Sequence, residues 1–379
     1  MKKILILASI FPPQKKGGGP AVSVFNLVKS IKKNYDIYII SHNHEIGDQK
    51  PLNGIKNGWN KYDYGKVYYF SYGKDKYIEI RKLIKEVQPD IIYSNSFFNF
   101  HYIIAALNFH KKNKHVKIII APRGELCKNA LKIKAIKKHI FILFLKVFNL
   151  LKDTNWHVTS EKELYDLKST LDVPSNKIYN IINFPGIKIK RYYPSTKKRD
   201  SLKMIYLSRI QKIKNLLQGL NYLKHLKGKI FLDIYGPIEE EDYWEKCKDV
   251  IEKLPENIVV EYKGFLEKNR IYDTMKGYDL FFLPTKSENF GHAIVEALIS
   301  SLPVLISDQT PWTEINYNKA GFAIPVKDHQ MFLEKINLFY HMDQEEHDLY
   351  KRNAFKFINK KIDCFVLKTN YRKMFDFLN

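Results

Sequence analysis

The sequence predicts an α/β protein made of two Rossmann-like domains, each with a parallel sheet. The chain has 379 residues, more than one typical core holds, so two domains of roughly 180 residues each are expected. Short apolar runs alternate with helical patterns in both halves, which is typical of parallel sheets covered by helices. Between residues 183 and 201 the pattern breaks, and turn-forming Pro and Gly appear without periodicity.

Continuous apolar runs mark the strands of the first half, because strands buried on both faces of a sheet carry few polar residues. Strands are expected over residues 4–9, 35–41, 91–94, 116–121 and 156–160, and helices over 21–32 and 77–87. Residues 1–8 also have the apolar character of a short signal peptide. A buried first strand is preferred, since Phe11-Pro12-Pro13 follows at once without a small-residue cleavage site.

After residue 201 the alternation starts again. Strands are expected over 203–207, 230–235, 258–263, 280–284 and 303–307, with a helix over 215–226. We expect an N-terminal domain at 1–185, a linker at 186–200, a second domain at 201–357, and a helix over about 358–379 that packs back on the first domain. Ligands of such sheets bind at the carboxyl ends of the strands, so both edges are expected to face an interdomain cleft.

The net charge of +23 is concentrated in one half of the chain. Residues 1–191 carry an excess of 20 basic residues, whereas residues 192–379 carry an excess of 3. A lysine-rich composition would raise the charge everywhere. The uneven distribution therefore indicates an anionic partner of the first half, which is a membrane surface, a nucleic acid or a phosphorylated substrate.

The cysteines and apolar runs indicate a cellular compartment. Cys127, Cys247 and Cys364 form neither a disulfide framework nor a zinc-binding spacing, which indicates a reducing environment. The longest apolar run beyond the N-terminus, 140–145, is far shorter than the ~20 residues of a membrane-spanning helix. We expect a cytoplasmic protein that is not integral to a membrane.

The sharpest candidate site is the segment 287–298, which follows an expected strand and runs into a helix beginning near Gly291 or His292. Backbone N–H groups at a helix start bind anions or hydroxyls. Glu288 in the turn and Glu296 about one turn into the helix suit the hydroxyls of a polyol ligand. The alternative is that Glu288 caps the helix and Glu296 is a solvated surface residue.

The turn after the first expected strand is a further candidate site in each half. Arg209 and Lys214 suit a diphosphate whose negative charge grows as a bond to it breaks. Gly17-Gly18-Gly19-Pro20 permits close approach of a phosphate or a sugar to the backbone, although it is neither a dinucleotide fingerprint nor a P-loop. The alternatives are an ordinary basic loop and a flexible turn.

These elements, in this order, resemble the GT4 family of retaining glycosyltransferases with the GT-B fold. Glu288 and Glu296 match the family's E-x7-E motif, and Arg209 with Lys214 matches its phosphate-binding pair. Further matching stretches are 156–161, 234–237, 262–264 and 307–312. The resemblance covers essentially the whole chain and is to the branch that builds bacterial capsule, O-antigen or lipopolysaccharide chains.

The resemblance implies a nucleotide-diphosphate sugar as co-substrate, with Arg209, Lys214 and Glu288 as the catalytic groups. Arg209 and Lys214 are expected to neutralise the departing diphosphate, and Glu288 to contact hydroxyls of the donor sugar. The other donor-binding residues implied are Glu296 on the ribose hydroxyls, Asn289, Phe290, Gly291, His292, Gly236, and Gly18 with Gly19 from the first domain. No metal or other cofactor is expected, in agreement with the lack of an Asp-x-Asp motif in the sequence.

The expected mechanism is front-face substitution with retention, in which the donor's own phosphate accepts the proton of the acceptor. The acceptor side departs from the family pattern. Many relatives have a histidine after the strand that corresponds to 116–121, whereas here the loop reads Pro122-Arg123-Gly124-Glu125. Arg123 is the candidate acceptor-side residue, although arginine cannot act as a general base.

Lysines alternate with apolar residues between positions 128 and 152, as in a basic amphipathic helix pair lying on anionic lipid. The lysines are Lys128, Lys132, Lys134, Lys137, Lys138, Lys146 and Lys152, and the apolar residues are Leu131, Ile133, Ile136, Ile140, Phe141, Phe144, Phe148 and Leu151. The alternative is a helix whose apolar face is simply core. The resemblance implies a polyprenyl-diphosphate-linked or lipopolysaccharide acceptor, so peripheral association with the inner face of the cytoplasmic membrane is expected.

Two other functions remain as alternatives. A GT-B epimerase acting on a sugar nucleotide is the rival enzyme, and it differs in needing no acceptor. Nucleic-acid binding is favoured by the charge alone, but none of the recognisable binding modules is found, so no nucleic-acid partner is expected.

Overall fold

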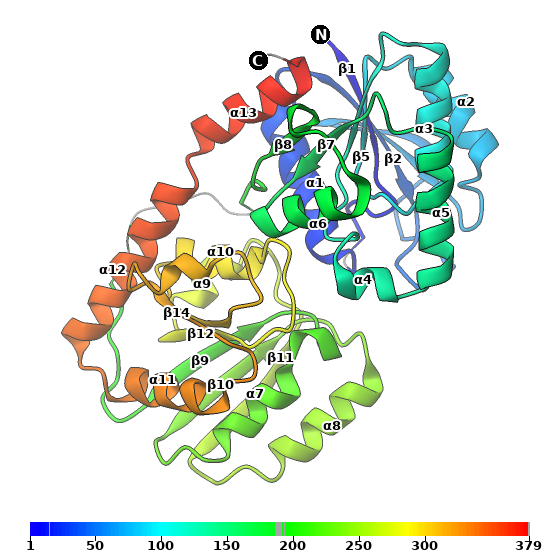
Figure 1. Cartoon of the computed structure of the whole chain (residues 1–379). Helices are drawn as coiled ribbons and strands as arrows, with labels where there is room; N and C mark the ends of the chain where they lie inside the picture. The colour runs from blue at the N-terminus through cyan, green and yellow to red at the C-terminus, as the bar shows by residue number, and fades with distance from the viewer. Residues whose placement is uncertain (15, 186–191, 193, 378–379) are drawn as a thin grey trace. The chain divides into compact units, whose positions relative to one another are not determined.

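The computed structural model describes residues 1–14, 16–185, 192 and 194–377. They form two compact α/β units, of which the first contains Met1–Phe184 and the stretch from Cys364, and the second contains Pro185–Asp363 (Figure 1). Both sheets are built mainly of parallel strands, which confirms the predicted fold class. Residues 186–191 and 193 of the expected linker 186–200 lie outside the described residues.

The described residues of the first unit form an eight-stranded sheet in the order β3-β4-β2-β1-β5-β6-β7-β8. The strands are β1 (Lys3–Leu7), β2 (Asp36–His42), β3 (Gly58–Tyr62), β4 (Gly65–Phe70), β5 (Ile91–Ser94), β6 (Lys117–Ile120), β7 (Asn155–Val158) and β8 (Ile178–Asn180). Neighbouring strands are parallel except β3 and β4, which pair antiparallel at one edge. This hairpin was not predicted, because β3 is a partly exposed edge strand without an apolar run.

Helices cover this sheet (Figure 1), and all the residues of its central strand β5 are buried. The helices are α1 (Gly18–Ile31), α2 (Tyr77–Val87), α3 (Phe100–Lys112), α4 (Lys128–Lys132), α5 (Ala135–Val147), α6 (Glu161–Leu171) and α13 (Cys364–Asp376), with a 3-10 turn at Ser175–Lys177. Helix α2 ends at Val87, and its C-cap residue Gln88 adopts the left-handed conformation before Pro89. The Asn99 side chain caps α3 by accepting from the N–H of Tyr102 at 3.2 Å.

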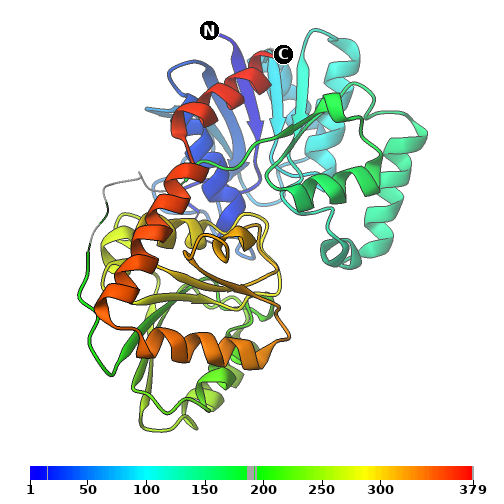
Figure 2. The same ribbon diagram turned by 60° about the vertical axis from the view of Figure 1, so that its left-hand side comes forward.

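The C-terminal helix differs from the one expected over about 358–379. Helix α12 continues to Lys361, Ile362 leaves the helical conformation, and α13 begins only at Cys364. Within the first unit the Tyr371 ring of α13 stacks on Phe184 at 4.8 Å. Both views place the two ends of the chain side by side (Figures 1 and 2), where Lys2 pairs with Asp376 at 3.1 Å.

The second unit has a fully parallel six-stranded sheet in the order β11-β10-β9-β12-β13-β14 within the described residues. The strands are β9 (Leu202–Leu207), β10 (Ile230–Tyr235), β11 (Ile258–Gly264), β12 (Leu280–Leu283), β13 (Val304–Ser307) and β14 (Gly321–Ile324). The helices are α7 (Leu216–Leu223), α8 (Glu241–Ile251), α9 (Ile271–Met275), α10 (His292–Ile299), α11 (His329–His341) and α12 (Gln344–Lys361), with 3-10 turns at Lys212–Lys214 and Thr313–Ile315. Of all the helices in the described residues, none has the length and hydrophobicity needed to cross a membrane.

Candidate functional site

The strand order of the second unit creates a topological switch point between β9 and β12. The two strands are neighbours in the sheet, but the chain continues from β9 to β10 on one side and from β12 to β13 on the other. Ligands of open parallel sheets bind beyond the carboxyl ends of such a strand pair. Arg209 and Lys214 follow β9 and Glu288 follows β12, so these three residues flank the switch point.

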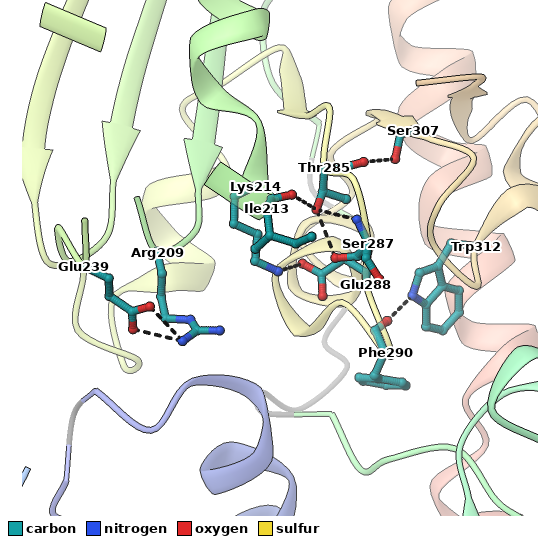
Figure 3. Close-up of polar contacts among 10 residues, drawn as sticks. All are labelled: Arg209, Ile213, Lys214, Glu239, Thr285, Ser287, Glu288, Phe290, Ser307 and Trp312. Carbon is teal, nitrogen blue, oxygen red and sulfur yellow. Dashed lines mark hydrogen bonds and ion pairs between the residues drawn. The ribbon is translucent and has the colours of Figure 1, made fainter. Parts of the chain in front are cut away.

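Lys214 and Glu288 form an ion pair across the switch point (Figure 3). Lys214 Nζ donates to Glu288 Oε1, and the two side chains are only 10% and 15% exposed. The turns that carry them are also joined, because the N–H of Lys286 and the hydroxyl of Thr285 donate to the Ile213 carbonyl at 2.8 and 3.1 Å. Residues far apart in the sequence are thus held as one largely buried pair.

The loop after β12 is also tied to the turn after β13. The N–H of Glu288 donates to the Gln309 carbonyl at 2.9 Å. The hydroxyl of Ser307 donates to the Thr285 carbonyl (Figure 3). These bonds fix the backbone of the loop, so Glu288 is held by its main chain as well as by Lys214.

Gly291 ends this loop and is the N-cap residue of α10. Its φ of 76° lies in the left-handed region, where glycine is favoured. The indole N–H of Trp312 donates to the carbonyl of Phe290 just before it (Figure 3). No side chain caps α10, and Glu288 is paired with Lys214 instead. The interpretation of Glu288 as a helix cap is therefore wrong.

Glu296 lies on α10, one turn after His292 and on the same face of the helix. It is 5% exposed. Burial raises the pKa of its carboxyl to about 7, and the nearby charge of Lys268 opposes that shift. The interpretation of Glu296 as a solvated surface residue is therefore wrong. A carboxyl with a pKa near neutrality changes its charge readily when a ligand donates hydrogen bonds to it.

Arg209 is paired with Glu239, a residue that the sequence analysis missed. Arg209 Nη1 lies 2.9 Å from both carboxylate oxygens of Glu239, and the side chains are 34% and 22% exposed. In Figure 3 this pair stands apart from Lys214 and Glu288, and in the described residues no hydrogen bond or ion pair joins the two pairs. The available signal was the acidic run 239–242, which begins two residues after Pro237 at the end of β10, the strand next to β9.

Gly236 lies directly beside the turn that carries Arg209. Its φ is 137°, and a Cβ atom there would lie 1.9 Å from the carbonyl oxygen of Ser208, so only glycine fits. The N–H of Gly236 donates to the Gly264 carbonyl at 2.9 Å. The Tyr262 hydroxyl donates to the Gly236 carbonyl at 2.9 Å. The structure therefore joins Gly236 and the matching stretch 262–264 at the carboxyl ends of β10 and β11.

The remaining candidates belong to the first unit, where the switch point lies between β1 and β5. Helix α1 begins at Gly18 rather than at residue 21, with no side-chain cap and no acidic residue in its first turn. Asn95, which was not predicted, follows β5 and donates to the Pro20 carbonyl at 3.4 Å. Its amide oxygen accepts from Arg123 Nε at 2.7 Å. Asn95 thereby links the turn of Gly18 and Gly19 to Arg123.

The second-unit arrangement suits a ligand that carries both hydroxyls and negative charge. Lys214 and Arg209 supply positive charge, Glu288 and Glu296 accept from hydroxyls, and the first turn of α10 presents backbone N–H groups. In the part of the chain that the structure describes, no group of three or more His, Cys, Asp or Glu side chains is placed to hold a metal ion.

Part of the chain is similar to a known protein family. Residues 191–357 match the family described as glycosyl transferases group 1, a segment that contains all the second-unit candidates. The chain is 24% identical over 274 residues to an uncharacterized 41.2 kDa protein in the cps region of Klebsiella pneumoniae. The matched segment covers 66% of this chain and 72% of that protein.

Solved structures resemble the whole chain. The Anabaena protein Alr3699/HepE, determined with UDP and glucose, superposes with a TM-score of 0.72 at 16% identity, covering 100% of both chains. The lipopolysaccharide outer core galactosyltransferase WaaB superposes with a TM-score of 0.67 at 16% identity, again covering 100% of both chains. At this identity the likeness establishes the fold, which is that of the GT-B glycosyltransferases.

Proposed function

We propose that this chain, whose second unit matches the group 1 glycosyl transferases, is a glycosyltransferase of the GT4 type. It moves a sugar from a nucleotide-diphosphate-sugar donor to a lipid-linked or polysaccharide acceptor with retention of configuration. The observation that carries the proposal is the buried pair of Lys214 and Glu288 at the switch point. A role in cell-surface glycan biosynthesis is supported by the cps-region relative and by the likeness to an enzyme of the lipopolysaccharide outer core.

The proposed donor contacts follow from the chemistry of each group. Glu296 accepts from the ribose hydroxyls and Glu288 from hydroxyls of the donor sugar, since carboxylates are strong acceptors for O–H donors. Arg209 and Lys214 neutralise the diphosphate. The backbone of the loop 289–291 with His292, together with Gly236, completes the proposed donor site, and Gly18 with Gly19 remains a predicted contact of the first unit.

The proposed chemistry is a front-face substitution. The bond between the anomeric carbon and the diphosphate oxygen breaks as the acceptor hydroxyl attacks from the same face. The acceptor's proton passes to the departing phosphate oxygen, so no protein base is needed. Positive charge from Arg209 and Lys214 stabilises the diphosphate as its negative charge grows, which is also the task that a metal ion would perform. We therefore propose that the reaction needs no metal ion.

An anionic membrane surface is the proposed partner of α5. Residues Ile136, Ile140, Leu143 and Val147 recur at helical spacing and are 61–76% exposed. The opposite side of α5, with Phe141, Ile142 and Leu145, packs into the core of the first unit, so Phe141 is not part of the exposed face. Lysines flank this stripe, which suits the boundary between anionic headgroups and acyl chains.

A thermal-shift screen across UDP-, GDP-, ADP- and CMP-sugars tests the donor assignment. A donor that binds only the native state must raise the melting temperature. UDP-sugars are the first candidates, because the Anabaena structure contains UDP and glucose. We expect one nucleotide class to stabilise the protein. No shift with any sugar nucleotide would contradict the proposed function.

The need for an acceptor distinguishes the proposed transferase from an epimerase of the same fold. The proposed transferase consumes donor in proportion to added acceptor glycan, whereas an epimerase interconverts the sugar nucleotide alone. Nuclear magnetic resonance of the donor pool with and without acceptor distinguishes the two activities. Epimerisation of the sugar nucleotide in the absence of acceptor would favour the epimerase.

A further inference from the structure

Arg123 has a special place at the carboxyl edge of the first sheet. It follows β6, and its φ of 55° lies in the left-handed region, which is unfavourable for a residue with a Cβ atom. Such backbone strain persists only where surrounding contacts enforce it, and it is concentrated at functional sites. The contacts of the guanidinium explain how the conformation is held.

The guanidinium is fixed by three hydrogen bonds, and every acceptor is neutral. Nε donates to Asn95 Oδ1 at 2.7 Å, Nη1 to Asn183 Oδ1 at 2.7 Å, and Nη2 to the Tyr93 hydroxyl at 2.6 Å. All three acceptor residues are buried. The five N–H groups of arginine include two that these bonds do not use, and its charge is permanent.

The network behind Tyr93 keeps its hydroxyl neutral. His157 is completely buried, and burial together with the charge of Arg123 lowers the pKa of its imidazole to about 3. Its Nε2 lies 2.8 Å from the Ile181 carbonyl, so the neutral ring donates there and Nδ1 accepts from the Tyr93 hydroxyl at 2.8 Å. Tyr93 therefore offers Arg123 an oxygen lone pair and no negative charge.

The carboxylates of Glu163 and Glu125, which lie near Arg123, are engaged by other donors. Glu163 accepts from the N–H of Gly124 and from the N–H and hydroxyl of Thr159, at 2.7 to 2.9 Å. Glu125 accepts from Ser96 and from the N–H of Phe97 and Phe98. Among the described residues no carboxylate lies within ion-pairing distance of Arg123, unlike Arg209 and Lys214, which are both paired with glutamates.

A second feature at the same edge favours negative charge. The amide of Asn95 that holds Arg123 also contacts the Pro20 carbonyl in the first turn of α1. This helix has 14 residues, no side-chain cap and no acidic residue in its first turn. The positive end of the helix dipole and its first backbone N–H groups thus lie next to the network of Arg123.

We propose that Arg123, oriented by Asn95, Asn183 and Tyr93, is the receptor in the first unit for an oxyanion of the acceptor. The bound group is a carboxylate or a phosphate, which the planar guanidinium fork matches in geometry and charge. That Arg123 binds an oxyanion follows from its contacts alone. That this oxyanion belongs to the acceptor rests on the proposed function. The acceptor is then an acidic glycan or a lipid phosphate rather than a neutral sugar chain.

Binding of small probes to three proteins tests this proposal: the wild type, Arg123→Gln and Arg123→Lys. The probes are methyl glucuronide for a sugar carboxylate, geranyl phosphate for a lipid phosphate, and methyl glucoside as the neutral match. We expect one oxyanion probe to bind the wild type and methyl glucoside not to bind. Arg123→Gln should weaken that binding about tenfold or more, since hydrogen bonds to charged groups are lost. Arg123→Lys should retain part of it, because it keeps the charge without the fork.

The sugar nucleotide found in the thermal-shift screen serves as the folding control, because Arg123→Gln should bind it as the wild type does. Lys214→Met is the matched variant that should weaken binding of the sugar nucleotide and leave binding of the oxyanion probe unchanged. Equal probe binding by the wild type and Arg123→Gln, or probe binding lost only in Lys214→Met, would overturn the proposal. A loss of sugar-nucleotide binding in well-folded Arg123→Gln would overturn the acceptor assignment. Arg123-dependent probe binding without any sugar-nucleotide binding would leave this site standing while the proposed function fails.

Discussion

Single residues differ in how their charge is balanced at the two sheet edges. In the second unit Arg209 is paired with Glu239 and Lys214 with Glu288. In the first unit Arg123 is bonded only to neutral acceptors. A diphosphate that binds in the second unit must compete with two glutamates for its cations, whereas an oxyanion at Arg123 meets no competing ion pair among the described residues.

The sequence identified the charged candidates but not their partners. Arg209, Lys214 and Glu288 were found because each follows an apolar strand, which is a local signal. Glu239 and Asn95 were missed, because each lies on another strand connection and becomes a partner only through the strand order. That order depends on pairings between distant segments, which local patterns do not specify.

Replacing Glu239 by Gln should strengthen binding of the sugar nucleotide, because the diphosphate no longer competes with a carboxylate for Arg209. The pair is partly exposed, so we expect only about a twofold to fivefold gain in affinity. Calorimetric titration measures it. Glu240→Gln is the matched control, since it removes the same charge from the neighbouring residue, which lies 3.9 Å from Lys212. Weaker donor binding by Glu239→Gln would show that Glu239 itself contacts the donor.

Glu296 predicts a pH dependence of stability and of donor binding. Its pKa is raised by burial from 4.5 to about 7. The unfolded chain therefore loses this proton at lower pH than the folded chain, and the stability contributed by the protonated carboxyl falls as pH rises from about 4.5 to about 7. Ribose hydroxyls donate to the ionised form, so donor affinity should rise as pH increases through about 7.

Titrations between about pH 5.5 and 8.5 check this sign. A nucleotide-diphosphate sugar is the suitable ligand, because both ends of its diphosphate are esterified and it does not itself ionise near neutrality. The Glu296→Gln variant should lose the rise in affinity. A wild-type affinity that is constant or falls over this range would contradict the assignment of Glu296 to the ribose.

Secondary-structure elements were predictable to different degrees. Strands β5 and β10 begin and end at the expected residues. Turn-forming residues adjoin each of them, with Pro89-Asp90 before β5 and Gly236-Pro237 after β10. Helix α1 begins three residues before its expected start, because Gly18 and Gly19 enter the helix although glycine is a poor helix former. Strand β14 was not predicted, since its four residues start with glycine and give no periodic signal.

Gly236 follows β10 and packs against the turn that carries Arg209, so its replacement should destabilise the protein. An alanine there would have a strained φ and a Cβ 1.9 Å from the Ser208 carbonyl, next to Arg209. We expect Gly236→Ala to lower the free energy of unfolding by about 2 kcal/mol or more. Denaturant titration gives the value. Gly264→Ala is the control, because it has a positive φ but no atom near its Cβ position and should cost only about 1 kcal/mol. Equal losses in both variants would contradict the steric argument.

At the scale of the whole molecule, the sequence predicted two α/β domains with parallel sheets, and the structure has that fold class. The uneven charge, with an excess of 20 basic residues in 1–191, was equally visible in the sequence. The sequence did not show which apolar residues remain outside the core. Helix α5 carries apolar residues on two sides, and the pattern alone does not say which side packs.

The exposed stripe of α5 predicts salt-sensitive binding to anionic membranes. The combined change of Ile136, Ile140 and Leu143 to Ser should reduce co-sedimentation with anionic vesicles several-fold, since each apolar side chain adds to interfacial affinity. Ile78→Ser is the control, as Ile78 is 73% exposed on α2 in the same unit. Wild-type binding should weaken with salt and be lower on neutral vesicles. Sedimentation unaffected by the triple change would contradict a membrane role for α5.

The most direct test of the donor site is sugar transfer by Arg209→Ala, followed as release of the nucleotide diphosphate. Arg209 is proposed to act on charge that grows during bond breaking, so kcat should fall about a hundredfold while donor affinity changes less. Arg352→Ala, an exposed arginine on α12, is the matched control and should behave as the wild type. Near-normal turnover by Arg209→Ala would contradict the account, and a markedly lower kcat with donor binding largely retained is the result it predicts.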